Sequence, residues 1–193
     1  MEKLKKDKGS GIYIQIGAGA GDLDERANKR DGFTELVKGL SREKIRKIIL
    51  VEPNVLNIKK LKECWKEYPE SEIYEIGIVG KKNEKDKMYL YYSPLDGPHY
   101  QVGSINRSHI EKHYGENCEI EKMKIEVKNI EEFLKDVTKE EIELLSLDIE
   151  GIDAEIILDL NFENVKIKYL SFEYIHLGKE KEKVLEHLKK NNY

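Results

Sequence analysis

The sequence predicts a single α/β domain with a mostly parallel central sheet flanked by helices. Two observations lead to this prediction. Short apolar runs rich in β-branched residues alternate along the chain with segments of helical period, and 193 residues is the size of one domain rather than two. Hydrophobic residues make up 39% of the chain, which is enough for one core. We therefore assign residues 1–193 to one domain.

The predicted strands are the short apolar runs. They lie at Ile12–Gly17, Lys47–Glu52, Ile73–Val79, Met88–Tyr92, Lys124–Val127, Leu144–Asp148 and Lys168–Glu173. Because helical segments separate several of them, we expect most of the pairing to be parallel.

The predicted helices carry apolar residues at helical spacing. They lie at Thr34–Leu40, Asn54–Glu67, Ile130–Lys135, Asp153–Leu158 and Lys179–Asn191. Asn54–Glu67 has the clearest pattern, because its apolar residues lie close to one face, and Asn54 is a suitable N-cap.

Two stretches do not fit this alternation. Residues 22–32 are polar and delay the first helix, and residues 93–115 predict a long loop with a turn at Asp96-Gly97-Pro98. The chain also ends on a helix where this architecture usually continues with a strand. The C-terminal strands are therefore expected to be missing, because either the sheet edge is short or the sequence is truncated.

Composition argues against several classes of partner. The net charge of −4 does not favour broad attraction to nucleic acid or to an anionic membrane. No apolar run approaches the ~20 residues of a membrane helix, and the charged start of the chain does not resemble a signal peptide. Cys64 and Cys118 lack metal-ligand spacing, so we expect two reduced thiols in a cytoplasmic protein. The oligomeric state is not predicted.

The first predicted strand runs directly into a glycine-rich loop, Gly17-Ala18-Gly19-Ala20-Gly21-Asp22. Glycines at the carboxyl end of a parallel strand remove the Cβ atoms and permit positive φ, so that a cofactor can approach the backbone. We therefore expect this loop to contact a cofactor.

The second predicted strand ends in an acid, in the sequence Val51-Glu52-Pro53-Asn54. A carboxylate at this tip is well placed to accept hydrogen bonds from both ribose hydroxyls of an adenosine. The pair of glycine loop and strand-tip acid predicts an adenosine-containing cofactor.

Two cofactor classes use such a pair. A dinucleotide needs a helix N-terminus for its pyrophosphate, whereas here Asp22 and further polar residues follow the glycines. An acid at this position would repel a pyrophosphate but suits the cationic sulfonium and amino group of S-adenosylmethionine. An NAD(P)-dependent oxidoreductase stays as the alternative, although neither Tyr68 nor the tyrosines of 89–92 supply a Tyr-x-x-x-Lys pair.

The segment Leu144–Ile157, which contains Asp148-Ile149-Glu150-Gly151, resembles the D-x-E-G-x-x-x-x-[LIV] signature of FkbM-type methyltransferases. The glycine loop resembles the first cofactor motif of this family, and the segment around Glu52 resembles its ribose-binding motif. Gly77 and Ile78 lie where the strand beside the adenine is expected. Ser171–Tyr174 resembles the fifth strand, which ends in a Glu.

This resemblance implies a Rossmann-like class I methyltransferase fold and S-adenosylmethionine as cofactor, with S-adenosylhomocysteine as product. It also implies an acceptor hydroxyl on a sugar, glycan or other small molecule. The cofactor-binding residues expected from the loop, the strand tips and the resemblance are Gly17, Ala18, Gly19, Gly21, Asp22, Glu52, Asn54, Gly77, Ile78 and Asp148.

Methyl transfer to a hydroxyl needs alignment and a group that accepts a proton. The candidate catalytic residues cluster at the ends of the last two strands: Asp148, Glu150, Glu173 and His176. We expect one of Asp148 and Glu150 to point across the sheet and the other to point away from it. His99 and Tyr100 are candidates for covering the substrate, whereas His109 and His113 are expected at the surface.

Two further hypotheses stay open. Asp148, Glu150, Asp153, Glu173 and His176 could together hold a divalent metal that activates the acceptor oxygen, but no metal site is assigned. A catalytically silent cofactor-binding module is also compatible with the motifs.

Overall fold

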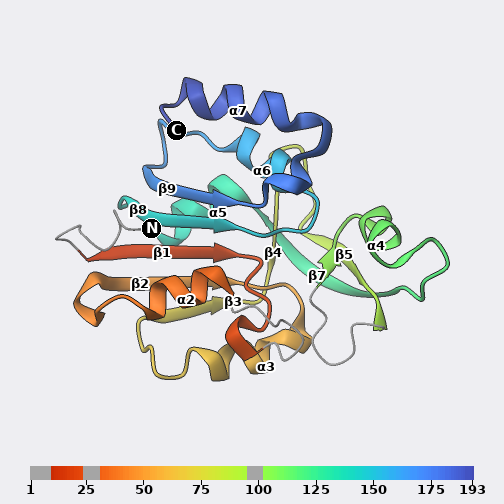
Figure 1. The fold of residues 1–193 in the computed structure, drawn as a ribbon, viewed down its shortest axis with the longest axis horizontal. Coiled ribbons are helices and arrows are strands. Elements are labelled where there is room, and N and C mark those ends of the chain that lie inside the picture. The colour runs from red at the N-terminus through yellow and green to blue at the C-terminus, as the bar shows by residue number, and fades with distance from the viewer. Residues whose placement is uncertain (1–9, 24–30, 95–101) are drawn as a thin grey trace.

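A computed structural model describes residues 10–23, 31–94 and 102–193. Within these ranges, five parallel strands form the central sheet in the order β3-β2-β1-β8-β9. These strands are β1 (Gly11–Ile16), β2 (Ile45–Val51), β3 (Ser71–Tyr74), β8 (Ile142–Leu147) and β9 (Ile167–Phe172). The prediction of an α/β fold with a mostly parallel central sheet is confirmed (Figure 1).

Helices cover both faces of this sheet. The helices are α2 (Gly32–Lys38), α3 (Val55–Cys64), α5 (Ile130–Val137), α6 (Asp153–Asp159) and α7 (Lys181–Lys190), with short 3-10 helices η1 (Gly21–Leu23), η2 (Arg42–Lys44) and η4 (Tyr174–Glu180). Apolar residues of α5, α6 and α7 share one core cluster with Ile14, and those of α2 and α3 share another with Tyr13. None of the helices in the described ranges is long and apolar enough to cross a membrane.

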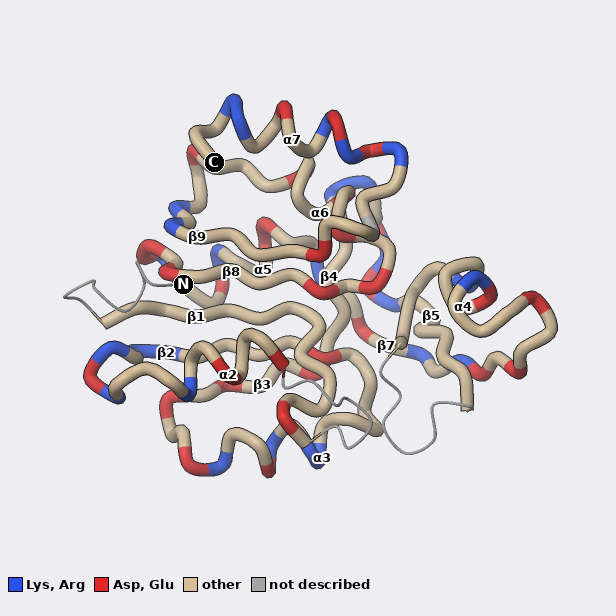
Figure 2. The backbone as a smooth tube through the Cα atoms, in the orientation of Figure 1, with Lys and Arg blue, Asp and Glu red and all other residues tan. Residues whose placement is uncertain are grey.

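β1 lies at the centre of the sheet because both of its faces can be buried. Every residue of this strand is buried, and its side chains alternate between the two core clusters. Figure 2 shows the strand free of charged residues. A near-continuous apolar run of this kind is typical of a strand covered by helices on both sides.

The helix after β2 starts where the sequence predicts. Asn54 is its N-cap, and the Asn54 side-chain oxygen accepts a hydrogen bond from the Leu56 amide at 3.0 Å. The helix ends at Cys64, three residues before the predicted end, and Trp65 packs beneath it with 1% of its surface exposed. This start places Glu52 and Pro53 in the turn between strand and helix.

A second, smaller sheet lies beyond the carboxyl ends of the central strands (Figure 1). Its described strands are β4 (Gly77–Val79), β5 (Lys87–Tyr92), β6 (Gly103–Ser104) and β7 (Glu121–Asn129), in the order β4-β7-β5-β6. β4 and β7 are parallel, and the other two pairs are antiparallel. The predicted strand Ile73–Val79 is therefore wrong as one unit, because its halves β3 and β4 join different sheets.

The predicted loop over residues 93–115 also differs from the structure. Its described part contains β6 and a helix, α4 (Arg107–Tyr114), whose N-cap Asn106 accepts a hydrogen bond from the Ser108 amide at 3.2 Å. Only Ile110 of this helix is buried. One buried residue gives no apolar period, which is why sequence patterning missed the helix.

Candidate functional site

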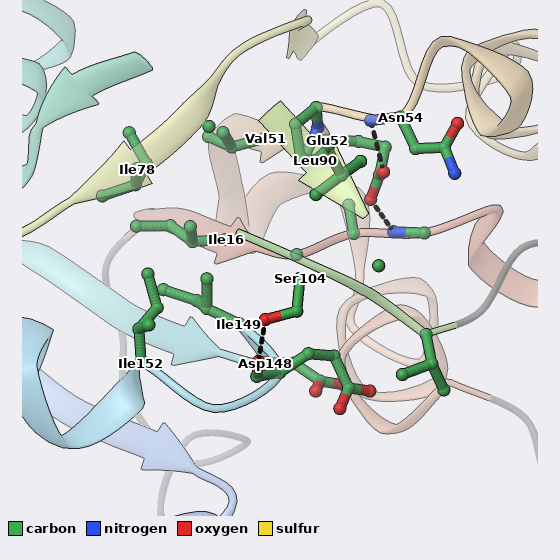
Figure 3. Close-up of a pocket in the computed structure, with 18 of the residues that line it drawn as sticks. Ile16, Val51, Glu52, Asn54, Ile78, Leu90, Ser104, Asp148, Ile149 and Ile152 are labelled. Carbon is green, nitrogen blue, oxygen red and sulfur yellow. Dashed lines mark hydrogen bonds between the residues drawn. The ribbon is translucent and has the colours of Figure 1, made fainter. Parts of the chain in front are cut away.

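A cavity of about 630 Å³ lies between the two sheets. The carboxyl ends of β1, β2, β8 and β9 form one side, and the second sheet forms the other (Figure 3). Ligands bind at this edge in open α/β sheets. The lining residues are Ile16 to Asp22, Asp31, Gly32, Val51 to Asn54, Ile76 to Ile78, Leu90, Val102 to Ile105, His113, Ile125, Asp148 to Glu150, Ile152, Glu173 and Ile175.

Gly17 allows the ends of β1 and β8 to come close together. Its φ is +84°, and a Cβ atom built on it would lie 1.8 Å from the backbone oxygen of Asp148. The Asp148 amide donates to the Ile16 carbonyl at 2.9 Å, and the Gly17 amide donates to the Val51 carbonyl at 2.9 Å. Only glycine satisfies both the conformation and the space at this point.

Glu52 holds the glycine loop against the end of β2. Its carboxylate is 6% exposed and accepts hydrogen bonds from the Gly19 amide at 2.7 Å and the Asn54 amide at 2.8 Å, one on each oxygen (Figure 3). Burial raises the pKa of Glu52 to about 7, against the opposing effect of these two hydrogen bonds and of a third from the Asn57 side chain. A carboxylate offers about four acceptor positions, so the group can still accept a hydrogen bond from a hydroxyl in the cavity.

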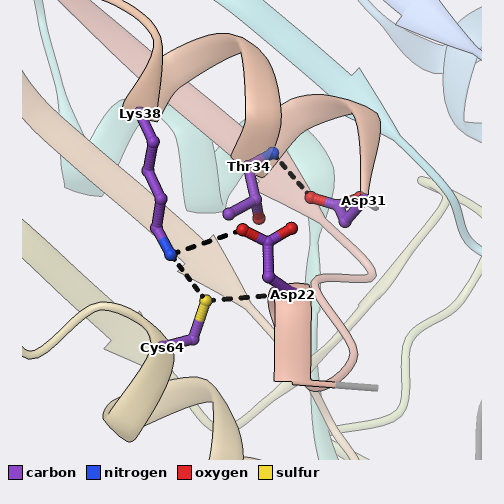
Figure 4. A network of polar contacts seen from close by, with 5 residues as sticks. All are labelled: Asp22, Asp31, Thr34, Lys38 and Cys64. Atoms are coloured by element: carbon purple, nitrogen blue, oxygen red, sulfur yellow. Dashed lines mark hydrogen bonds and ion pairs between the residues drawn. The ribbon is translucent and has the colours of Figure 1, made fainter. Parts of the chain in front are cut away.

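Asp22 lies at the far end of the same loop and pairs with a cation. One of its oxygens is 3.5 Å from Lys38 Nζ, and Lys38 also donates to Cys64 Sγ at 3.1 Å (Figure 4). Burial alone would lower the pKa of Lys38, but its contacts with Cys64 and Asp22 raise it above the ordinary value. The other oxygen of Asp22, Oδ1, is buried without a hydrogen-bond partner among the described residues. This oxygen is a candidate acceptor for a donor in the cavity.

Acidic side chains gather at the opposite side of the cavity, where Figure 2 shows red positions at the carboxyl ends of β8 and β9. Asp148 is half-buried, and burial followed by the charges of Glu150 and Glu173 raises its pKa to about 8. The folded protein therefore holds the Asp148 proton at neutral pH.

The predicted opposite orientation of Asp148 and Glu150 is wrong, because both line the same cavity. β8 ends at Leu147, so strand alternation does not extend to these residues. Glu150 has a φ of +36° and Gly151 a φ of +98°, which turns the chain sharply after the strand. Such positive φ values in a non-glycine residue are costly and concentrate at functional sites.

Two hydrogen bonds attach the β6–α4 segment to this turn. Ser104 Oγ donates to the Glu150 carbonyl at 2.7 Å, and His109 Nε2 lies 2.9 Å from Glu150 Oε2. The His109 and Glu150 side chains are only 16% and 20% exposed. His109 was expected at the surface and is instead partly buried against the site, whereas His113 is exposed and lines the cavity.

The structure brings most of the predicted site residues together. All ten residues predicted to bind the cofactor line the cavity, as do Glu150 and Glu173. His99 and Tyr100 lie outside the described residues, and so does the side chain of His176, whose backbone belongs to η4.

Sequence reasoning missed the wall that the second sheet contributes. Leu90, Ile105 and Ile125 form its apolar part, and Ser104 adds a hydroxyl. The spacing of His109 and His113, four residues apart, was the one signal that could have pointed to this wall.

The described residues contain no group of three or more His, Cys, Asp or Glu side chains placed to hold a metal ion. Asp153, one of the proposed ligands, is 1% exposed and accepts a hydrogen bond from the Ile149 amide at 3.2 Å. It contributes to the turn after β8.

Comparisons with known proteins point to one family. The sequence model of the methyltransferase FkbM domain matches residues 15–193. No curated protein matches the chain. Among solved structures, the methyltransferase FkbM from Methylobacillus flagellatus KT matches with a TM-score of 0.49 and 13% sequence identity, covering 93% of this chain and 37% of that chain. This chain therefore spans well under half the length of that protein.

Replacing Gly17 with alanine should destabilise the protein more than the same change at Gly19. At Gly17 the new methyl group would collide with the Asp148 backbone, whereas at Gly19, also at positive φ, nothing lies within 4 Å. We expect Gly17→Ala to cost about 2 kcal/mol or more beyond the cost of Gly19→Ala, measured by urea unfolding. Equal losses would show that the backbones of β1 and β8 do not approach this closely.

Replacing Asp148 with Asn should make stability less dependent on pH. Burial and neighbouring carboxylates raise the pKa of Asp148 from 3.8 to about 8, so the folded chain keeps a proton that the unfolded chain loses. This stabilisation is complete below a pH of 3.8 and is lost as the pH rises through about 8. The free energy of unfolding of Asp148→Asn, relative to the unaltered protein, should therefore increase from pH 5 to pH 8, by at most about 1.4 kcal/mol per unit.

The measurement is urea unfolding at several pH values. The exposed Glu163 gives a matched control, because Glu163→Gln removes a carboxylate of the same charge outside the cavity. A difference between Asp148→Asn and the unaltered protein that stays constant over this range would contradict the raised pKa.

Proposed function

Because the chain belongs to the FkbM methyltransferase family, we propose that it is a class I methyltransferase that uses S-adenosylmethionine and methylates a hydroxyl of a sugar, glycan or other small molecule. The observation that carries the proposal is Glu52, a buried carboxylate that lines the cavity between the glycine loop and the start of α3. The family match does not favour the NAD(P)-dependent oxidoreductase or the silent binding module.

The residues present fit the cofactor. Glu52 keeps acceptor capacity for a ribose hydroxyl beside its three hydrogen bonds, and Gly19 leaves open space above the loop. Asp22 Oδ1 is a buried acceptor without a described partner, which suits an amino group. Gly77 and Ile78 add an apolar surface from β4 against which an adenine ring can pack. S-adenosylmethionine, when bound, supplies a methyl group on a sulfonium, which is an excellent leaving group.

The protein must then orient the acceptor hydroxyl and accept its proton. Among the candidates Asp148, Glu150, Glu173 and His176, we assign the base to Glu150. Asp148 is a poorer base at neutral pH, because its pKa of about 8 keeps it largely protonated, and it can instead donate a hydrogen bond. Glu150 lines the cavity, and His109 holds its carboxylate at 2.9 Å. Glu150 would accept the proton of the acceptor hydroxyl, and S-adenosylmethionine, once bound, would supply the methyl group and leave as the thioether S-adenosylhomocysteine.

Part of the cavity wall beside these carboxylates is apolar. Leu90, Ile125 and Ile149 line the space around the carboxylates. A less aqueous environment strengthens the electrostatic contacts that orient the acceptor.

Replacing Glu52 with Gln should weaken cofactor binding. The change removes the negative charge that the ribose hydroxyls would contact. It also places a side-chain NH2 group opposite the backbone amide of Gly19 or Asn54, so that one of these amides loses its acceptor. We expect the affinity for S-adenosylhomocysteine to fall about tenfold or more in calorimetry. In the unaltered protein the affinity should rise from pH 6 to pH 8, because the pKa of Glu52 is about 7 and its charged form is the better acceptor. Glu52→Gln should lose this pH dependence.

Glu63→Gln is the matched control, because Glu63 is an exposed carboxylate on α3. A thermal-shift screen with S-adenosylmethionine, S-adenosylhomocysteine, NAD and NADP completes the test, since a ligand of the folded state raises the melting temperature. Stabilisation by NAD alone, or an unchanged affinity in Glu52→Gln, would overturn the proposed cofactor site.

Glu150→Gln should lower kcat about a hundredfold, the usual contribution of a general base, and leave the affinity for S-adenosylhomocysteine intact. His109→Gln should also lower kcat, because it removes the contact that holds the Glu150 carboxylate. The measurement is transfer of a labelled methyl group to a panel of mono- and oligosaccharides, with Glu163→Gln as control. Full turnover by Glu150→Gln would exclude Glu150 as the base. Cofactor binding without methyl transfer to any hydroxyl acceptor would favour a catalytically silent cofactor-binding module.

A further inference from the structure

The second sheet has an outer face that differs sharply from the face toward the core. On β5 and β7, Leu90, Ile125 and Val127 pack into an apolar cluster. The residues that alternate with them point the other way, and they are Lys87, Tyr89 and Tyr91 on β5 and Lys122, Lys124 and Glu126 on β7. We call these six residues the outer face.

The outer face presents aromatic rings among lysines. Tyr89 is 47% exposed, and Lys122 Nζ lies 4.4 Å from the centre of its ring. Register pairs Tyr89 with Lys124 and Tyr91 with Lys122 across the two strands. The third pair is Lys87 with Glu126, whose charged atoms are 3.3 Å apart.

A hollow of about 250 Å³ opens beside these rings. Its lining residues are Lys85, Lys87, Met88, Tyr89, Tyr91, Ile105 and Lys124. Of the described residues that line it, three are lysines and none is acidic. This local positive charge stands against a net charge of −4 for the whole chain.

We propose that this hollow is a second binding site, for a sugar that carries a phosphate or carboxylate group. The lysines attract the anionic group, and the exposed tyrosine rings offer a flat apolar surface for the C–H face of the sugar ring. At about 30 Å³ per water molecule, the hollow has room for about eight waters, which is the scale of one sugar ring with its substituent.

A short anion fits this surface better than a long polyanion does. Acidic residues lie next to the residues that line the hollow: Glu126 is paired with Lys87, and the exposed Asp86 stands between Lys85 and Lys87 in the sequence. A nucleic acid that continued past the hollow would meet these carboxylates and the negative charge of the whole chain, whereas tight binding of nucleic acid needs an extended basic surface.

The position of the hollow connects it to the cavity. Ile105 lines both spaces, so a ligand that crosses Ile105 would contact the outer face with one end and the cavity with the other. Resting on the proposed function, this arrangement identifies the acceptor as a saccharide with an anionic group remote from the reacting hydroxyl.

The test measures binding to the whole chain by calorimetry, with glucose, glucose 6-phosphate, glucuronate and inorganic phosphate as probes. Glucose 6-phosphate or glucuronate should bind more tightly than both glucose and inorganic phosphate. Lys124→Gln and Tyr89→Ala should each weaken this binding about fivefold. Lys189→Gln, which removes an exposed lysine on α7, should not. The affinity for S-adenosylhomocysteine should be the same in all variants, which separates this site from the proposed cofactor site.

Three outcomes would overturn the proposal. Equal binding of inorganic phosphate and the sugar phosphate would exclude recognition of the ring. Unchanged affinity in both Lys124→Gln and Tyr89→Ala would place binding elsewhere. Tighter binding of a short single-stranded RNA than of either charged sugar, lost in the same variants, would assign the outer face to nucleic acid.

Discussion

The buried carboxylate of Glu52 is the contact on which the arrangement of the cavity depends. It joins three pieces of chain that lie far apart in sequence or differ in structure: the glycine loop after β1, the end of β2 and the start of α3. Burying a carboxylate is costly unless hydrogen bonds compensate it, and here two backbone amides and the Asn57 side chain do so. Because Gly19 is one of the donors, the loop is held open toward the cavity before any ligand binds. Such preorganisation lowers the entropic cost of ligand binding.

The second sheet turns an open strand edge into an enclosed site. Its inner face supplies apolar side chains over the carboxyl ends of β1 and β8, and the β6–α4 segment fastens to the turn at Glu150. The same sheet places lysines and tyrosines on its outer face. A single pair of strands therefore separates an acidic cavity from a basic surface, because successive residues of a strand alternate between its faces.

Sequence patterning predicted the part of the fold that is set by burial. β1, β2, β8 and β9 lie within a few residues of their predicted positions. β1 and β8 are mostly buried and apolar, whereas β9 is an edge strand that was recognisable from its apolar residues although only Ile167 is buried. The strand-tip acid Glu52 followed from the same reasoning. Patterning could not show that the run from Ile73 to Val79 divides between two sheets, since both halves are apolar and only tertiary pairing distinguishes them.

The contact between His109 and Glu150 was beyond sequence reasoning for a related reason. The two residues are 41 positions apart, and α4 carries too few buried residues to show its period. The expected separation of Asp148 and Glu150 was wrong as well, because residues two apart share a face in a strand and because β8 already ends at Leu147, before the turn at Glu150. Predictions from residue spacing hold inside regular elements and fail at the turns where this site is built.

The acidic cluster links ligand charge to proton release. Asp148 keeps its proton at neutral pH because burial and the carboxylates of Glu150 and Glu173 oppose a further negative charge. A cationic ligand in the cavity would reverse this balance by favouring the ionised form of Asp148, and thermodynamic linkage then requires that binding of the cation expels a proton. A neutral ligand such as a demethylated thioether has no charge with which to do so. The difference in proton release between these two ligands would follow from the arrangement of three carboxyl groups at the ends of β8 and β9, and Asp148 would respond to the charge that the proposed reaction consumes.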